Sequence, residues 1–138
     1  MNYLSQKKGF LGYEAKNIIK NKVVVIPFGL EKTVSYGGGT RNGPREIIKA
    51  SHQVELFDEE LNKEPYKKIG IKTLKPFSIK KKILPALDQL SKINHKIILE
   101  NKFPLVLGGE HSITSGSIRP FVKKYKEIII LILCLLFS

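Results

Sequence analysis

The chain has 138 residues and a formal net charge of +12, and its length suits one domain with a hydrophobic core. The positive charge comes mainly from lysine, because Arg41, Arg45 and Arg119 are the only arginines. Specific nucleic-acid recognition favours arginine, and scattered lysines are typical of a solvated surface, so we expect no nucleic-acid partner. A single cysteine, Cys134, excludes an internal disulfide, and the absence of a cleavable signal pattern predicts a cytoplasmic protein.

The N-terminal third shows a strand pattern followed by a helix pattern. Val23 to Ile26 form an apolar run that predicts a strand closed by Pro27. A glycine-rich loop, residues 37–43, comes next. The following helix is expected to begin at Pro44 and run to about residue 50, because proline lacks the N–H group that is unpaired in a first helical turn.

The middle of the chain predicts two short strands and a long helix. The apolar runs at residues 54–57 and 69–71 suit the strands. Apolar side chains then recur at helical spacing over residues 78–101, which predicts an amphipathic helix. Pro85 falls inside that pattern, so we expect a kink or a restart near Leu84.

The most informative stretch is PLVLGGEHSIT, residues 104–114. Its apolar residues 105–107 predict a strand covered on both faces, and Gly108 and Gly109 then permit a sharp turn and a close backbone approach. This turn presents His111 at the carboxyl end of a strand, where open α/β sheets bind their ligands. Imidazole is the commonest metal ligand. From these residues alone, a hydrogen-bonded turn histidine and a metal ligand both remain open.

The C-terminal part predicts a helix from about Ser112, interrupted by Pro120, and then a terminal strand over the apolar run Ile128 to Phe137. That run is shorter than the roughly 18 residues that a membrane span requires, so we expect no membrane partner. Strands that alternate with helices predict a mostly parallel sheet with helices on both faces. We see no repeat and no linker, so we expect one domain.

Separated motifs of this sequence resemble the ureohydrolase family, which includes arginase and agmatinase. GGEHS, residues 108–112, resembles the first metal-ligand motif of that family. VVVIPFG at 23–29, SYGGGTRNGPREIIKAS at 35–51 and VELFDEEL at 54–61 resemble the opening of agmatinase-like members, in the same order. The resemblance covers residues 23–127, and several motifs in the right order are far more specific than one.

The resemblance implies a three-layer α/β/α fold with a mostly parallel sheet, as in arginase, truncated to about the N-terminal half. Family members are roughly twice as long as this chain. Residues 1–138 would then form a single incomplete domain, in which residues 1–21 are an N-terminal extension and residues 22–138 are the N-terminal half of the α/β domain.

The resemblance also implies an agmatinase-like activity, in which agmatine is hydrolysed to putrescine and urea at a dinuclear manganese centre. His111 is the one residue that carries over as a metal ligand, and Glu110 and Ser112 carry over as supporting residues of the motif. The family's later Asp-Ala-His-x-Asp and Asp-x-Asp motifs are absent from this sequence. We therefore expect a truncated, inactive chain that does not retain the two Mn²⁺ ions, and we assign no catalytic residue.

Some alternatives stay open at this point. The chain could be a non-catalytic interaction partner of an intact ureohydrolase, or it could derive from an enzyme for arginine or another small guanidino substrate. A homo-oligomer is compatible with the sequence. The loop at 37–43 is either a structural connection or an element on the substrate side, because its glycine spacing does not match a phosphate-binding motif.

The remaining candidate ligands have weaker patterns. His52 and His95 have no partner at metal-ligand spacing, so we interpret both as surface residues. The acidic run at 58–60 is interpreted as a solvated turn, because adjacent residues in a loop point in different directions.

Overall fold

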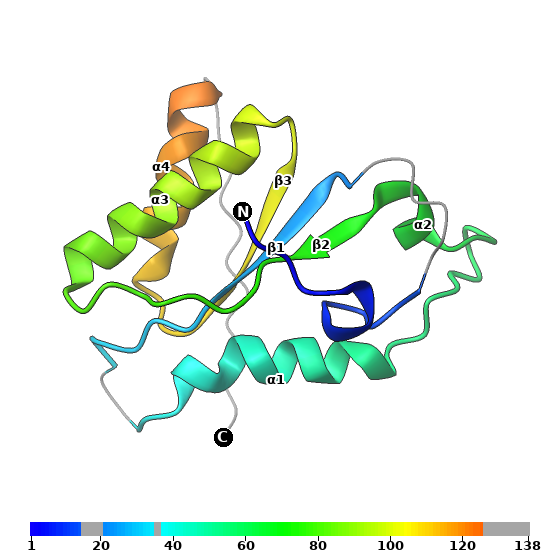
Figure 1. Ribbon diagram of the computed structural model, residues 1–138, viewed down its shortest axis with the longest axis horizontal. Coiled ribbons are helices and arrows are strands. Elements are labelled where there is room, and N and C mark those ends of the chain that lie inside the picture. The colour runs from blue at the N-terminus through cyan, green and yellow to red at the C-terminus, as the bar shows by residue number, and fades with distance from the viewer. Residues whose placement is uncertain (15–20, 35–36, 126–138) are drawn as a thin grey trace.

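The computed structural model describes residues 1–14, 21–34 and 37–125. Three parallel strands form a sheet in the order β2-β1-β3 (Figure 1). The strands are β1 (Val23–Phe28), β2 (Ile71–Thr73) and β3 (Phe103–Gly108). β1 is central, because it pairs with β2 through its first half and with β3 along its whole length. The prediction of a parallel sheet is confirmed.

Helices cover both faces of this sheet. The described α-helices are α1 (Gly43–Ala50), α2 (Pro65–Ile69), α3 (Ile83–Leu99) and α4 (Ile113–Lys124). Short 3-10 helices are η1 (Gln6–Lys8), η2 (Thr40–Asn42) and η3 (Ser51–Gln53). α3 and α4 pack side by side over one face, and α1 lies across the opposite face (Figure 1). This three-layer arrangement confirms the predicted fold class.

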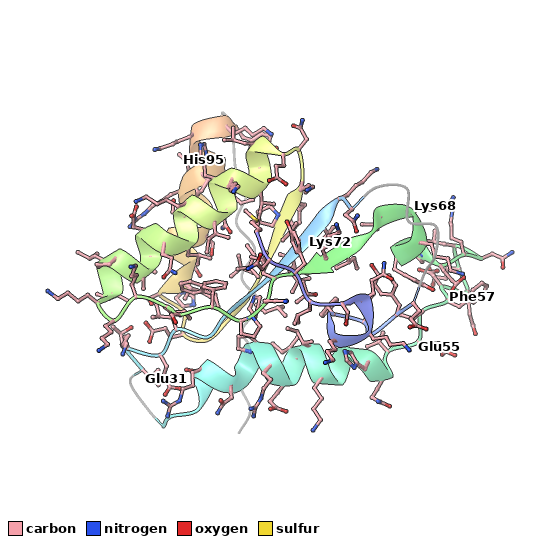
Figure 2. All side chains as sticks on the ribbon, viewed as in Figure 1. Glu31, Glu55, Phe57, Lys68, Lys72 and His95 are labelled. Atoms are coloured by element: carbon pink, nitrogen blue, oxygen red, sulfur yellow. The ribbon has the colours of Figure 1, made fainter. Side chains whose placement is uncertain are left out.

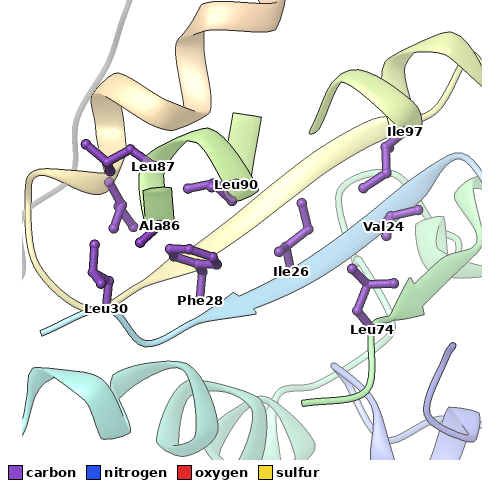
Figure 3. Close-up of a cluster of buried hydrophobic side chains, with 10 residues drawn as sticks. Val24, Ile26, Phe28, Leu30, Leu74, Ala86, Leu87, Leu90 and Ile97 are labelled. Atoms are coloured by element: carbon purple, nitrogen blue, oxygen red, sulfur yellow. The ribbon is translucent and has the colours of Figure 1, made fainter. Parts of the chain in front are cut away.

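The core lies between β1 and α3. Val24, Ile26 and Phe28 alternate along β1 and therefore point to the same face of the sheet, where they are fully buried. They pack with Leu87 and Leu90 of α3 (Figure 3). Burying one such side chain contributes about 1.5–3 kcal/mol, so this layer is a main source of the stability of the domain.

Pro27 does not close the first strand, which was predicted to end there. β1 continues to Phe28, and Pro27 stays in register with Leu107 of β3. The carbonyl of Val25 accepts a hydrogen bond from the Leu74 N–H on the β2 side, at 2.9 Å. Residues two apart in a strand direct their backbone groups to the same side, so the nitrogen of Pro27 faces the region beyond the end of β2. No ladder hydrogen bond is lost there.

The two helical prolines behave differently from each other. The helix predicted from residue 78 begins only at Ile83, so neither a kink nor a restart occurs. Pro85 is the third residue of α3, in the turn where N–H groups are unpaired, and proline is tolerated there. α4 continues through Pro120, so the predicted interruption is wrong. Its packing on α3 is close, because a Cβ atom added at Gly116 would lie 2.7 Å from the carbonyl oxygen of Leu87. This packing holds the helix although proline removes one of its hydrogen bonds.

Two strand predictions need correction. Residues 54–57 form no strand, because Val54 and Phe57 are exposed and only an isolated bridge joins Asp58 to Lys63. The strand predicted at 69–71 is displaced, since α2 occupies residues 65–69. Gly70 ends that helix with a φ of 64°, and β2 begins one residue later.

The predicted terminal strand at 128–137 and its Cys134 lie outside the described residues. In the part of the chain that the structure describes, no helix has both the length and the apolar character needed to cross a membrane.

Candidate functional site

His111 lies in the turn that joins β3 to α4, at the carboxyl end of the sheet. β3 ends at Gly108 and α4 begins at Ile113, and the side chain of His111 is exposed. The Glu110 N–H donates a hydrogen bond to the carbonyl of Leu30 at 2.9 Å, which connects this turn to the loop that follows β1. The structure therefore places His111 where the sequence predicted it, and it also brings a second loop to the site.

Two glycines allow these loops to meet. A Cβ atom at Gly109 would lie 2.2 Å from the carbonyl oxygen of Leu30, and one at Gly29 would lie 2.2 Å from that of Arg41. Both contacts are with backbone, which cannot rotate away. Neither glycine adopts a positive φ. Close backbone approach, and not left-handed conformation, is what requires glycine at this edge of the sheet.

The carboxylate of Glu110 is the centre of the site. It is only 7% exposed, and it points back from the turn into the loop after β1. The backbone N–H groups of Lys32 and Thr33 donate to Oε2, the latter at 2.6 Å. Hydroxyl groups of Thr33 and Ser112 donate to Oε1 at 3.0 and 2.5 Å. Four donors from both loops therefore satisfy a single carboxylate.

These contacts keep Glu110 ionised. Burial raises the pKa of its carboxyl, but the hydrogen bonds from Ser112 and from the backbone of Thr33 and Lys32 outweigh that effect and lower the pKa to about 2. A carboxylate that accepts several backbone N–H bonds is strongly stabilised in its charged form. Glu110 is thus an anion at neutral pH, and it fixes the backbone of the two loops whose groups donate to it.

Glu31 does the same for the glycine-rich loop. Its Oε2 accepts hydrogen bonds from the N–H groups of Gly39 and Arg41 at 2.7 and 3.0 Å, and from the Thr40 hydroxyl at 3.0 Å. The hydrogen bond from the Arg41 backbone is the main reason that the pKa of Glu31 is below its ordinary value. Figure 2 shows Glu31 at the end of the molecule where α1 begins. The connection from β1 to α1 is therefore organised by two carboxylates.

The other sequence candidates lie away from this site. His95 is exposed on α3 (Figure 2), and His52 is exposed, with its Nε2 2.8 Å from the carbonyl oxygen of Gly9. Glu59 and Glu60 are exposed, and Asp58 accepts a hydrogen bond within its own turn. The predictions of surface histidines and of a solvated acidic turn are confirmed.

The described donor set does not by itself fit a dinuclear manganese centre. Across residues 1–14, 21–34 and 37–125, no group of three or more His, Cys, Asp or Glu side chains is arranged to hold a metal ion. His111 supplies one imidazole, whereas both oxygens of Glu110 already accept hydrogen bonds from protein donors. Manganese binds weakly in the divalent series and depends on several oxygen ligands.

The sequence did not predict the roles of Glu31 and Thr33, and it indicated only a supporting role for Glu110. The position of Glu110, directly after a buried strand and a glycine pair, could have indicated a carboxylate that organises neighbouring loops. A carboxylate that is buried there needs hydrogen-bond donors from the surrounding chain. Glu31 gave no comparable signal, since its partners lie eight to ten residues further along the chain.

Fold and site together define an α/β protein in which two loops meet at the carboxyl ends of a parallel sheet, the place where open α/β sheets generally bind ligands. The chain matches the Arginase family over residues 21–133, and it belongs to that family.

Relatives and solved structures agree with this membership. The N(1)-aminopropylagmatine ureohydrolase of Synechocystis is 36% identical over 132 residues, which are 91% of this chain and 43% of that protein. An agmatinase of Bacillus cereus is 33% identical over 116 residues, 81% of this chain and 39% of the relative. The agmatine ureohydrolase structure of Thermoplasma volcanium matches with a TM-score of 0.64 and 26% identity, covering 78% of this chain and 39% of that one.

The arginase structure of Bacillus subtilis has a TM-score of 0.53 and 31% identity, and the match covers 75% of this chain and 34% of that chain. In each case the chain spans about two fifths, or less, of the protein that it matches. These comparisons identify the fold and the family, and the family match over residues 21–133 includes the turn after β3.

Proposed function

We propose that the chain is an agmatinase-type member of the family, in which the turn after β3 supplies His111 to a manganese centre that hydrolyses a guanidinium group. The observation that carries this proposal is the position of His111, exposed at the carboxyl end of β3 within the matched region. Agmatine is the proposed substrate, with putrescine and urea as products. The names of the two relatives above refer to agmatine or to its aminopropyl derivative, which supports this substrate class.

In this proposal the residues around His111 have a positioning role. Glu110 joins the histidine turn to residues 32–33, and Glu31 holds residues 39–41. A ligand held within about 0.5 Å of its productive position needs such support from its surroundings. The two carboxylates thereby fix the backbone that presents the imidazole, and the loop at 37–43 forms the neighbouring wall of the substrate side.

We further propose that residues 1–138 alone are inactive, because the remaining metal ligands are not among the described residues. The test is urea release from agmatine by the purified chain with added Mn²⁺, together with its metal content after desalting. We expect no urea and less than one Mn²⁺ per chain. Stoichiometric manganese with turnover would contradict this part of the proposal.

A chimaera tests the proposed function itself. Residues 21–125 of this chain replace the matching segment of the Synechocystis relative, which supplies the rest of the fold. We expect urea release from agmatine or N(1)-aminopropylagmatine, and a loss of about 100-fold or more on His111→Ala. His95→Ala, at an exposed histidine on α3, is the matched control and should leave the rate unchanged.

One observation favours a second candidate, a non-catalytic partner of an intact ureohydrolase. Leu105, Val106 and Leu107 of β3 are only partly buried, whereas β1 is fully buried at Val24 to Ile26, and no described strand pairs with the second edge of β3. Such an edge can accept another strand. Co-purification with a full-length ureohydrolase would support this role, and we expect it to be abolished by Val106→Pro. The control, Lys81→Glu in the loop before α3, should still co-purify.

The proposed location is the cytoplasm, which cell fractionation with an antibody against the chain would test. Recovery of the chain in a membrane pellet after a carbonate wash would contradict it.

A further inference from the structure

A basic and aromatic groove lies at the amino end of the sheet, opposite to the His111 turn. Two cavities of about 750 and 330 Å³ adjoin there and share Ile98, Asn101 and Lys124. The larger is formed where β1 and β3 begin and where α3 and α4 end. We call this the amino-end groove and use six of its residues below: Lys22, Glu100, Lys102, Phe103, Lys124 and Tyr125.

The groove carries excess positive charge. Among the described residues, Lys22, Lys102 and Lys124 line it, and Glu100 is the one acidic residue of this lining. Glu100 is paired with Lys102 at 2.6 Å. Within the described residues, no carboxylate forms an ion pair with Lys22 or Lys124. Two ammonium groups are thus left to attract an anion into a cavity that is partly shielded from water.

Aromatic rings form the other part of the groove. The centroid of the Phe121 ring lies 6.4 Å from that of Phe103 and 6.3 Å from that of Tyr125, and the last two ring planes differ by 21°. Phe103 is 58% exposed and Tyr125 is 49% exposed, so much of each ring does not contribute to the core. The Lys124 Nζ lies 5.6 Å from the centroid of Tyr125, which places a cation beside an open ring.

We infer that the amino-end groove binds a nucleotide, whose base stacks on Phe103 and Tyr125 while its phosphates contact Lys22 and Lys124. Its volume is in the range of about 300–1,000 Å³ that small-ligand sites occupy. Lysine acts as a compact point charge for phosphate, and open rings stack on bases of any kind. The combination of rings and cations therefore selects a ligand with both a base and an anionic group.

This groove is separate from the proposed guanidine site. The six residues of β3 lie between it and the His111 turn, a span of roughly 20 Å at about 3.3 Å per residue. A guanidinium substrate is itself a cation, so the lysines of the groove repel it. The inference does not depend on the proposed hydrolase activity.

Titration calorimetry of the whole chain tests the inference with three probes, namely ADP, adenosine and inorganic tripolyphosphate. We expect ADP to bind at least about tenfold more tightly than either of the other two, because only ADP engages both rings and lysines. Equal binding of tripolyphosphate and ADP would overturn the inference, since charge alone would then explain it. Undetectable binding of millimolar ADP at 50 mM salt would overturn it as well.

Variants identify the groove as the binding site. Lys124→Glu should weaken ADP binding about tenfold and Phe103→Ala about fivefold, whereas Glu100→Gln should strengthen it because a competing carboxylate is removed. Lys81→Glu makes the same charge change in the loop before α3 and should have no effect. Thermal melting of each variant checks that the fold is retained, and an unchanged ADP affinity in folded Lys124→Glu and Phe103→Ala would overturn the assignment.

A single-stranded oligonucleotide separates a nucleotide site from a general polyanion surface. We expect oligothymidylate to bind more weakly per nucleotide than ADP does. If it instead binds more tightly, and its affinity falls linearly with the logarithm of the salt concentration, the groove is a polyanion surface and the inference is wrong.

Discussion

The two ends of the sheet use charged side chains in opposite ways. At the carboxyl end, Glu110 and Glu31 accept hydrogen bonds from the backbone and hydroxyl groups of their own loops, and Glu110 is buried. At the amino end, Lys22 and Lys124 line an open groove and have no carboxylate partner among the described residues. Charges that the chain itself satisfies stabilise a backbone conformation, whereas charges that it leaves unsatisfied are available to a ligand.

Aromatic side chains also differ between the two ends, because one is buried in the core and the other is exposed. Replacing one at each end by alanine should give the largest difference in the free energy of unfolding. Phe28 is fully buried between β1 and α3, so Phe28→Ala removes a core side chain and should lower the free energy of unfolding by about 3–5 kcal/mol. Phe103 is 58% exposed, so Phe103→Ala should cost less than about 1 kcal/mol. Urea denaturation of both variants measures the difference, and equal losses would contradict the comparison.

Removing the charge of Glu110 should have the next largest effect. In Glu110→Gln, one amide oxygen cannot replace two carboxylate oxygens, and the amide group turns a donor towards the N–H groups of Lys32 and Thr33. We expect a loss of about 2–3 kcal/mol in the free energy of unfolding. Glu55→Gln is the matched control at an exposed position, and a similar loss there would refute the special role of Glu110.

The low pKa of Glu110 predicts acid sensitivity. Its carboxyl has a pKa of about 2 in the folded chain against 4.5 as the ordinary value, so its contribution to stability is complete above about 4.5 and is lost as the pH falls towards 2. By linkage this contribution is at most about 3 kcal/mol. Denaturation curves between pH 2 and 6 should show this decline in the natural chain and a shallower one in Glu110→Gln. Parallel curves would rule the explanation out.

Adding a methyl group where the two loops approach each other closely at the carboxyl end should have a smaller effect on stability. Gly109→Ala places a methyl group against the carbonyl of Leu30, and we expect it to destabilise the fold by about 1–3 kcal/mol. Gly38→Ala is the control, because its added methyl group would lie at an ordinary contact distance of 3.8 Å from Oε1 of Glu31. Thermal unfolding of the two variants compares them, and a Gly109→Ala protein as stable as Gly38→Ala would show that the loops do not need this contact.

Glu31→Gln should produce the smallest effect, confined to one loop. The side chain holds residues 39–41 by three hydrogen bonds at the surface of the molecule. We expect faster amide exchange at Gly39 and Arg41 with no measurable change in the melting temperature. Exchange measured by NMR or mass spectrometry tests this, and unchanged protection of both amides would mean that the carboxylate does not organise the loop.

The sequence predicted those parts of the molecule that depend on local pattern. The strands at the apolar runs of β1 and β3, a helix that begins within one residue of Pro44 and the position of His111 all follow from nearby residues, and the structure contains each of them. Errors occurred where tertiary contacts decide the outcome. α4 continues through Pro120 because Gly116 packs on α3, and residues 54–57 form no strand because no described segment pairs with them.

Of the candidate site, the sequence predicted only the part formed by neighbouring residues, which is the histidine turn after β3. The glycine pair and the histidine are contiguous in the chain, so their position could be predicted. The carboxylates required knowledge of which loops meet, because Glu110 bonds to residues 77 and 78 positions earlier. The amino-end groove combines residues from the beginning of two strands and the end of two helices, an arrangement that no local pattern indicates.

The manganese content of the chimaera tests the central claim, that His111 is a metal ligand in an Arginase-family chain. Elemental analysis after desalting should find about two Mn²⁺ per chain with His111 in place and at most about one in His111→Ala. An unchanged manganese content in the folded His111→Ala chimaera would contradict the account.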